Sequence, residues 1–169
     1  YKSITELSVK ELRLGGLRID PKTNIGSRVT YYNNVKIRNL KNQKSEITQV
    51  KGLPKNPKLS NISWSPDQKR IALTNTTETG VELWVLELEN GSVTKLTEPN
   101  LNSNIGSVIN WFSDSENMLV KMISRNRKPL IDTNKIVPDG PTISTNFGEK
   151  AQNRTYQDLL KNKVDEHNF

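Results

Sequence analysis

A twelve-residue pattern occurs twice in this chain of 169 residues. The first copy, ISWSPDQKRIAL, covers residues 62–73, and the second, INWFSDSENMLV, covers residues 109–120, an offset of 47 residues. The matched positions are Ile62, Trp64, Asp67 and 71–73 in the first copy, and Ile109, Trp111, Asp114 and 118–120 in the second. A period of this size, with four short strands per repeat, is typical of β-propeller blades. An ordinary antiparallel meander is the alternative.

Residues 60–97 contain signals for four strands joined by short turns. Strands are predicted through 62–64, 71–73, 81–88 and 93–96, with turns at 65–68, 75–80 and 90–91. Pro66 presets φ in the first turn, and Asn90-Gly91 is a strong tight-turn signal. This segment is therefore expected to form a four-stranded antiparallel sheet.

The third of these strands is apolar on both faces. Alternate residues place Val81, Leu83 and Val85 on one face, and Trp84, Leu86 and Leu88 on the other. A strand that is apolar on both faces is buried on both faces, so this sheet needs a packing partner on each side. Tryptophans at alternating strand positions are accordingly interpreted as packing residues rather than ligand platforms. Residues 1–169 alone are expected to expose apolar sheet faces, and they can associate with copies of themselves through open strand edges.

The regions that flank this segment contain further local signals. Ser8 followed by Glu11 is a capping-box pattern and predicts a short helix that Gly15-Gly16 ends, followed by a loop over 16–28. Residues 31–50 alternate apolar and polar side chains around a polar turn, which predicts a hairpin. The residues expected to be buried in that hairpin are Val35, Ile37, Ile47 and Val50.

Beyond residue 125 the repeat pattern breaks. An extended, proline-containing excursion leads to a segment in which Tyr156, Leu159, Leu160 and Val164 recur at helical spacing, with Thr155 as the expected N-cap. The expected fold is thus mainly β. It is a partial propeller of about two four-stranded antiparallel blades, with a short N-terminal helix and a C-terminal helical insertion.

Composition excludes some functional classes. The chain has no cysteine, so disulfides and thiolate metal sites are excluded, and no apolar run approaches the ~20 residues needed to cross a bilayer. The net charge is +7, which invites a nucleic-acid-binding hypothesis. That hypothesis is disfavoured because the basic residues are scattered, and only Tyr31 and Tyr32 lie among them as stacking aromatics. A nucleic-acid binder would show strongly salt-dependent binding.

Candidate catalytic groups are few. The chain has one histidine, His167, and it contains neither a G-x-S-x-G elbow nor a phosphate-binding G-x-x-x-x-G-K-[ST] loop. No catalytic residue, metal site or cofactor is therefore predicted. Arg18, Arg28 and Arg154 lie in irregular segments where a guanidinium group can bind a substrate carboxylate. The alternative for each is a surface arginine bonded to loop carbonyls.

Several longer segments resemble a known family. LGGLRIDP, ISWSPDQKRIAL, VELWVLELENGSVTKLT, VPDGPTIS and RTYQDLLK together resemble the N-terminal propeller of the prolyl oligopeptidase family of serine peptidases. The branch that they resemble most is that of the glutamyl endopeptidases known from plant chloroplasts. The S-P-D turn is shared with many propellers, whereas LGGLRIDP and RTYQDLLK are more specific to this branch.

The resemblance implies a division of the chain and a role for it. Residues 31–50 would be the outer hairpin of one blade, 60–97 a complete blade, 107–124 the start of the next, and 125–169 an excursion with a helix.

An α/β-hydrolase domain carrying a Ser-Asp-His triad would follow. The propeller would admit peptides or unfolded segments to a peptidase that cleaves after glutamate. Bacterial members are often exported, which favours a periplasmic or secreted location. The alternative function is a non-enzymatic TolB-like propeller that serves as a protein-interaction platform.

Overall fold

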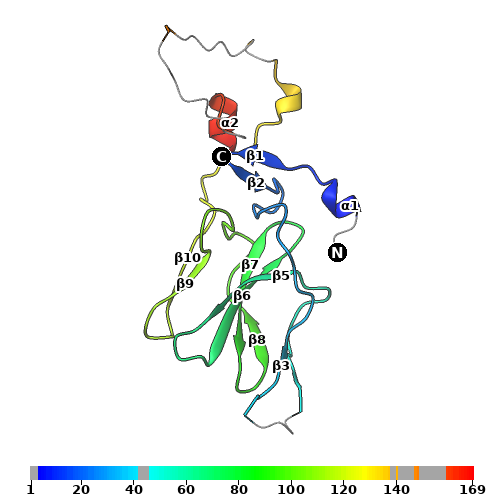
Figure 1. Cartoon of the computed structure of the whole chain (residues 1–169), viewed down its shortest axis with the longest axis vertical. Helices are drawn as coiled ribbons and strands as arrows, with labels where there is room; N and C mark the ends of the chain where they lie inside the picture. Colours follow the sequence, from blue (N-terminus) through cyan, green and yellow to red (C-terminus); the bar gives the residue numbers. More distant parts are fainter. Residues whose placement is uncertain (1–3, 42–45, 138–139, 141–146, 149–158) are drawn as a thin grey trace.

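The computed structural model of the chain describes residues 4–41, 46–137, 140, 147–148 and 159–169. The described residues are mainly β, with antiparallel sheets and few helices (Figure 1). The strands are β1 Leu12–Leu14, β2 Leu17–Ile19, β3 Lys36–Ile37, β4 Thr48–Gln49, β5 Leu59–Trp64, β6 Arg70–Thr76, β7 Val81–Glu87, β8 Ser92–Lys95, β9 Ile109–Trp111 and β10 Met118–Val120. The helical elements are α1 Ile4–Leu7, the 3₁₀ turn η1 Thr133–Lys135 and α2 Lys163–Asn168.

The predicted four-stranded segment forms one antiparallel sheet in the order β5-β6-β7-β8. β6 and β7 pair without interruption from Arg70↔Glu87 to Thr76↔Val81, whereas a register shift interrupts the pairing of β5 with β6 between Ser60 and Ser63. The other sheets among the described residues are the two-stranded β1-β2, β3-β4 and β9-β10. The described chain therefore contains one complete four-stranded sheet, not two.

Both faces of this sheet are covered by apolar residues, as the pattern of β7 predicts. Val81, Leu83 and Val85 join one cluster with Ile25, Leu101 and residues of β9. Leu86 joins a second cluster with Leu59, Ile71, Leu73 and Val93, against which Trp84, Leu88 and residues of the β3-β4 hairpin pack. Burial on both sides explains why β7 lacks the polar-apolar alternation of a half-exposed strand.

The two copies of the repeat fold alike. Trp64 pairs with Ile71 across β5-β6, and Trp111 pairs with Met118 across β9-β10, at matched positions. The turns also match in their hydrogen bonds: Ser65 N to Arg70 O at 2.9 Å with Lys69 N to Asp67 Oδ1 at 3.1 Å, and Phe112 N to Asn117 O at 2.9 Å with Glu116 N to Asp114 Oδ1 at 2.9 Å. Each turn places a non-glycine residue at positive φ, 60° at Gln68 and 62° at Ser115.

The N-terminal prediction is wrong. Residues 8–14 do not form a helix, and α1 ends before them at Leu7. Leu12–Leu14 and Leu17–Ile19 are instead the two strands of a hairpin. Gly15 and Gly16 have φ of 57° and 79°, and two successive residues in this region form the type I′ turn that suits a two-residue hairpin. The two glycines therefore reverse a strand here rather than end a helix.

The hairpin predicted over 31–50 is present but short, with only two residues in each strand. Val35, Ile37 and Val50 are partly buried against the second apolar cluster, as expected. Ile47 is exposed and was wrongly assigned to the interior.

The C-terminal helix starts later than the spacing of apolar residues predicts. Asn162 adopts an extended conformation, and its side chain accepts a 2.9 Å hydrogen bond from the Asp165 backbone N–H. An asparagine that caps a helix in this way sets the start of the helix at the next residue. Leu159 and Leu160 precede α2, while Thr155 and Tyr156 lie outside the described residues. None of the helices in the described ranges is long and apolar enough to cross a membrane.

α2 lies against the β1-β2 hairpin at one end of the molecule (Figure 1). Asn168 is buried there, where its side chain donates to the carbonyl of Ile131 at 3.0 Å and accepts from the Ile131 backbone N–H at 2.8 Å. The ring of Phe169 lies directly over Gly15, where an added Cβ would come within 3.0 Å of it. The hairpin and the C-terminal residues therefore fix each other's position.

Candidate functional site: a pocket bordered by Glu11 and Arg28

Two of the three arginines expected to bind a carboxylate lie beside the same acidic residue. Arg18, on β2, and Arg28, in the loop that follows, both contact Glu11. Glu11 lies just before β1, so the β1-β2 turn brings Arg18 back beside it. The third predicted residue, Arg154, lies outside the described residues.

Glu11 is held by several donors at once. Its Oε1 accepts from Arg18 Nη1 at 2.8 Å and from Arg13 Nε at 3.0 Å, and its Oε2 accepts from Ser27 Oγ at 2.7 Å. Arg28 Nε lies 3.9 Å from Oε2. The Ser27 hydroxyl, together with the two guanidinium groups, lowers the pKa of Glu11 to about 2. Glu11 is therefore ionised throughout the physiological range. It already forms an ion pair with Arg18, the less exposed of the two predicted arginines.

Arg28 remains available to a ligand. Its side chain is 67% exposed, whereas that of Arg18 is 31% exposed. Arg28 lines a pocket of about 130 Å³, together with Leu7, Val9, Glu11, Asp20, Thr23, Ser27, Tyr31, Lys58, Thr76 and Thr77. The Lys58 ammonium group lies 5.9 Å from the centre of the Tyr31 ring. The pocket thus has a cationic side chain on each of two separate segments.

Two buried threonines are among the residues that line the same pocket. Thr23 and Thr76 are 6% and 7% exposed, and within the described ranges neither hydroxyl oxygen has a hydrogen-bond partner. Buried polar groups are normally hydrogen-bonded, so these two hydroxyls are exceptions, and their oxygen atoms are themselves buried rather than open to the pocket. The one carboxylate nearby besides Glu11 is Asp20, and its Oδ1 accepts the backbone N–H groups of Lys22 and Thr23 at 2.8 and 3.3 Å.

The charged residues that line the pocket are two cations, Arg28 and Lys58, and two carboxylates, Glu11 and Asp20. Arg13 and Arg18 do not line it, but both pair with Glu11 and so compensate its charge. The guanidinium group of Arg28 and the ammonium group of Lys58 are chemically suited to a ligand carboxylate. The sequence pointed to the two arginines but not to Glu11 or Lys58. Glu11 was interpreted as a capping residue, and Lys58 was one of many scattered lysines.

His167 does not form part of a catalytic arrangement in the described residues. Its Nε2 lies 2.9 Å from the backbone carbonyl oxygen of Pro129, and the side chain is exposed. A nucleophile would instead need its hydroxyl within hydrogen-bond reach of the ring. Among the described residues, no group of three or more histidines and carboxylates could hold a metal ion.

Comparison with known proteins finds two relatives that match almost the whole chain. A protein of Arabidopsis thaliana named "Probable glutamyl endopeptidase, chloroplastic" is 31% identical over 178 residues, and one of the same name from Oryza sativa subsp. japonica is 28% identical over 175 residues. In both cases the match covers 96% of this chain. The chain spans 18% of the length of each relative. No protein-family model matches, and no solved structure matches significantly.

Proposed function

We propose that this chain is part of the substrate-gating propeller of a serine peptidase that cleaves after glutamate. The observation that carries the proposal is the similarity, over 96% of the chain, to two proteins named as glutamyl endopeptidases. Catalysis would be acyl transfer by a Ser-Asp-His triad outside these 169 residues, in an α/β-hydrolase domain of the prolyl oligopeptidase type. The residues described here would control access to it and steer peptides or unfolded segments toward it.

Two features of the structure support a propeller. The repeat folds into two hairpins with the same turn geometry, and the four-stranded sheet is apolar on both faces. In a propeller each sheet is covered by a neighbouring sheet on both sides, which requires such faces. The β3-β4 hairpin and the β9-β10 hairpin, on opposite faces, would belong to the neighbouring blades.

The pocket beside Arg28 would contribute recognition of acidic peptides. A glutamate side chain brings a carboxylate that can pair with the Arg28 guanidinium group and the Lys58 ammonium group. The net charge of +7 would add a general attraction for acidic substrates.

The test is an assay of the longer protein that contains these residues. Internally quenched peptides that differ only by Glu, Gln or Ala at the scissile position would be compared, with a fluorophosphonate as a serine-directed inhibitor. We expect cleavage after Glu that the inhibitor abolishes. A protein that neither cleaves these peptides nor reacts with the fluorophosphonate would contradict the proposal and favour a binding platform.

A further inference from the structure

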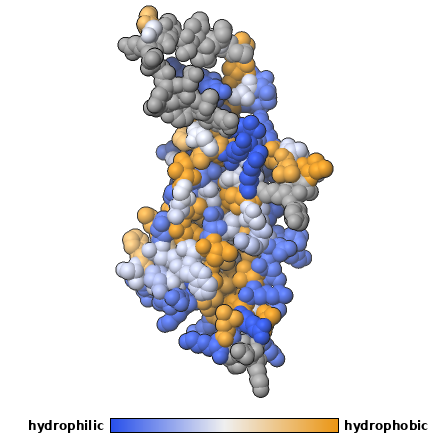
Figure 2. All heavy atoms as spheres, in the orientation of Figure 1, coloured by the Kyte–Doolittle hydropathy of each residue, from blue (hydrophilic) through white to orange (hydrophobic). Residues whose placement is uncertain are grey.

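The four-stranded sheet is covered unequally on its two faces. On the face of Leu86 and Val93, the outer strands β7 and β8 are covered by the β3-β4 hairpin. On that face the start of β5 is buried at Leu59, whereas Trp64 at the end of β5 is 56% exposed. Figure 2 shows that apolar residues reach the molecular surface in the part of the molecule that contains the sheet.

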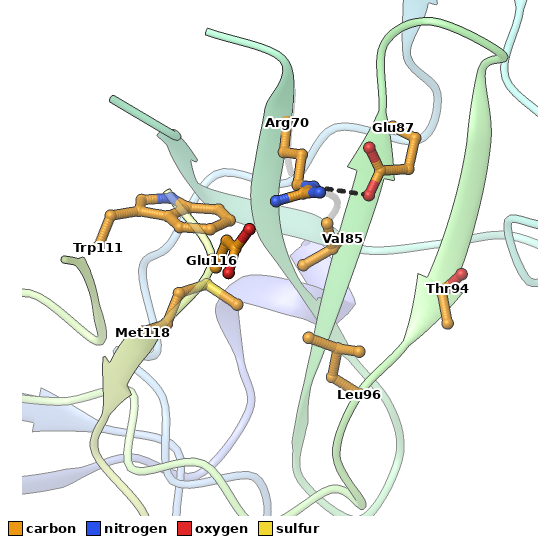
Figure 3. Close-up of a pocket in the computed structure, with 8 residues that line it drawn as sticks. All are labelled: Arg70, Val85, Glu87, Thr94, Leu96, Trp111, Glu116 and Met118. Carbon is orange, nitrogen blue, oxygen red and sulfur yellow. Dashed lines mark hydrogen bonds and ion pairs between the residues drawn. The ribbon is translucent and has the colours of Figure 1, made fainter. Parts of the chain in front are cut away.

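The opposite face shows the reverse arrangement. There the β9-β10 hairpin covers the part of the sheet nearer β5, and Trp111, Met118 and Val120 pack against the first apolar cluster. The part nearer β8 is open and forms a groove of about 430 Å³ (Figure 3). Val85 on β7 and Leu96, just after β8, form one side of the groove, and Leu96 is 50% exposed.

The other side of the groove is formed by Trp111 and Met118, which lie across from Val85 and Leu96 in Figure 3. Its polar groups largely satisfy one another. Arg70 Nε donates to Glu87 Oε1 at 2.8 Å, and its Nη1 donates to the Ser115 carbonyl at 2.9 Å. The open surface that remains is mainly apolar, although Thr94 and Glu116 also line the groove.

The free edge of β10 borders the same region. In the first copy of the repeat, β6 pairs with β5 on one side and with β7 on the other. β10 occupies the matching place in the second copy, but within the described ranges it pairs with β9 alone. After residue 125 the chain leaves the sheet for η1 and α2 at the far end of the molecule (Figure 1). Among the described residues, the second copy therefore has no counterparts of β7 and β8.

We propose that this groove receives a β-hairpin from the polypeptide that follows Phe169. Its first strand would pair with the free edge of β10, and its alternate apolar residues would pack on Val85, Leu96, Trp111 and Met118. The relatives provide ample chain for such a hairpin, since these 169 residues span 18% of their length. This inference rests on the propeller of the proposed function as well as on the repeat and the groove, but it does not depend on peptidase activity.

The β3-β4 hairpin shows, on the other face of the same sheet, how such an occupant would fit. Val35, Ile37 and Val50 pack against the cluster of Leu86 and Val93. Main-chain hydrogen bonds fix that hairpin to the sheet, from Lys51 N to Gly91 O at 2.8 Å and from Val93 N to Lys51 O at 2.9 Å. The groove side presents the same two strands, β7 and β8, so an occupant of the same kind matches it in shape and chemistry.

Photo-cross-linking in the longer protein tests the proposal. A benzophenone-bearing amino acid would replace Leu96, and cross-linked peptides would be identified by mass spectrometry after irradiation and digestion. We expect an intramolecular cross-link to a peptide beyond residue 169, independent of protein concentration. The matched control places the same group at position 95, because Lys95 projects to the opposite face, where it contacts Glu82 and Glu98. That variant should not capture the same peptide.

A second measurement uses oxidation of Met118 by hydrogen peroxide. We expect a loss of its oxidation in the folded longer protein relative to the same protein unfolded in urea. A cross-link to a second copy, or to another peptide within residues 1–169, would overturn the proposal. So would the absence of any cross-link together with Met118 oxidation as fast as in urea. Because neither readout involves substrate, the proposal can fail while peptidase activity is found, and the reverse also holds.

Discussion

The indole Nε1 of Trp111 donates a 3.2 Å hydrogen bond to the backbone carbonyl oxygen of Ser63. Ser63 lies on β5, at one edge of the four-stranded sheet, whereas Trp111 ends β9 in the second copy of the repeat. A second hydrogen bond between the two copies runs from the Asp67 backbone N–H to Ser115 Oγ at 3.0 Å. The two copies are thus joined by specific polar contacts as well as by apolar packing.

Replacing Trp111 tests this junction. Trp111→Phe keeps an aromatic ring but removes the N–H donor, so we expect a loss of about 1 kcal/mol in the free energy of unfolding. Trp111→Ala also removes the packing and should cost more, up to about 3 kcal/mol for a partly buried ring. Urea unfolding measures both. The neighbouring Phe112 is exposed, so Phe112→Leu should change stability by less than about 0.5 kcal/mol. Equal effects at positions 111 and 112 would contradict the role of the indole.

Gly52 holds the β3-β4 hairpin close to β8. An added Cβ would come within 2.8 Å of the Val93 carbonyl oxygen, and φ at Gly52 is 93°. Gly52→Ala should therefore destabilise the protein by about 2 kcal/mol or more, because the strained backbone and the steric contact act together. Gly16→Ala is the control: φ is 79°, but no heavy atom lies within 4 Å of the added Cβ, so about 1 kcal/mol is expected. Thermal unfolding of the two variants should rank them in this order, and the reverse order would be inconsistent with close docking.

Glu11 gives the stability of the protein a dependence on acidic pH. Its pKa is lowered from 4.5 to about 2 in the folded state, so folding is stabilised by its ionised form above about pH 4.5. That contribution is lost as the pH falls from about 4.5 toward 2. Glu11→Gln removes the charge, so the difference in urea midpoint between the unmodified protein and this variant should shrink over the same pH range. A difference that stays constant down to pH 2 would show that the ionised carboxylate does not stabilise the fold.

Arg28 is the arginine of the pocket that can reach a ligand. If it binds a substrate carboxylate, Arg28→Ala should lower kcat/KM for a glutamate peptide by about 10-fold or more, as the loss of one charge-assisted hydrogen bond predicts. The value for an alanine peptide should stay nearly constant. Arg13→Ala is the matched control, because Arg13 contacts the same Glu11 but does not line the pocket. An unchanged glutamate-to-alanine ratio in the Arg28 variant would reject the role.

Much of the sheet could be predicted from the sequence because its determinants are local. The apolar character of β7 on both faces, the Asn90-Gly91 turn and the two matched Asp turns all depend on residues a few positions apart. In both Asp turns the structure adds hydrogen bonds that lower the pKa of the aspartate, mainly from Ser65 at Asp67 and from the Asn117 side chain at Asp114. These hydrogen bonds join residues two or three positions apart, so pattern and structure agree there.

Tertiary structure decided the rest. Ser8 and Glu11 are spaced as in a helix cap, yet Glu11 pairs with arginines that only the β1-β2 turn and the following loop bring beside it. The C-terminal spacing predicted a longer helix, but the side chain of Asn162 ends the extended segment and starts α2 at Lys163. The sequence alone determined the strands of the four-stranded sheet and that β7 is covered on both sides, but it did not determine the strands β1 and β2. Contacts between residues far apart in the chain decided which segment covers each half of the sheet and which charges meet in the pocket. No local pattern encodes those contacts.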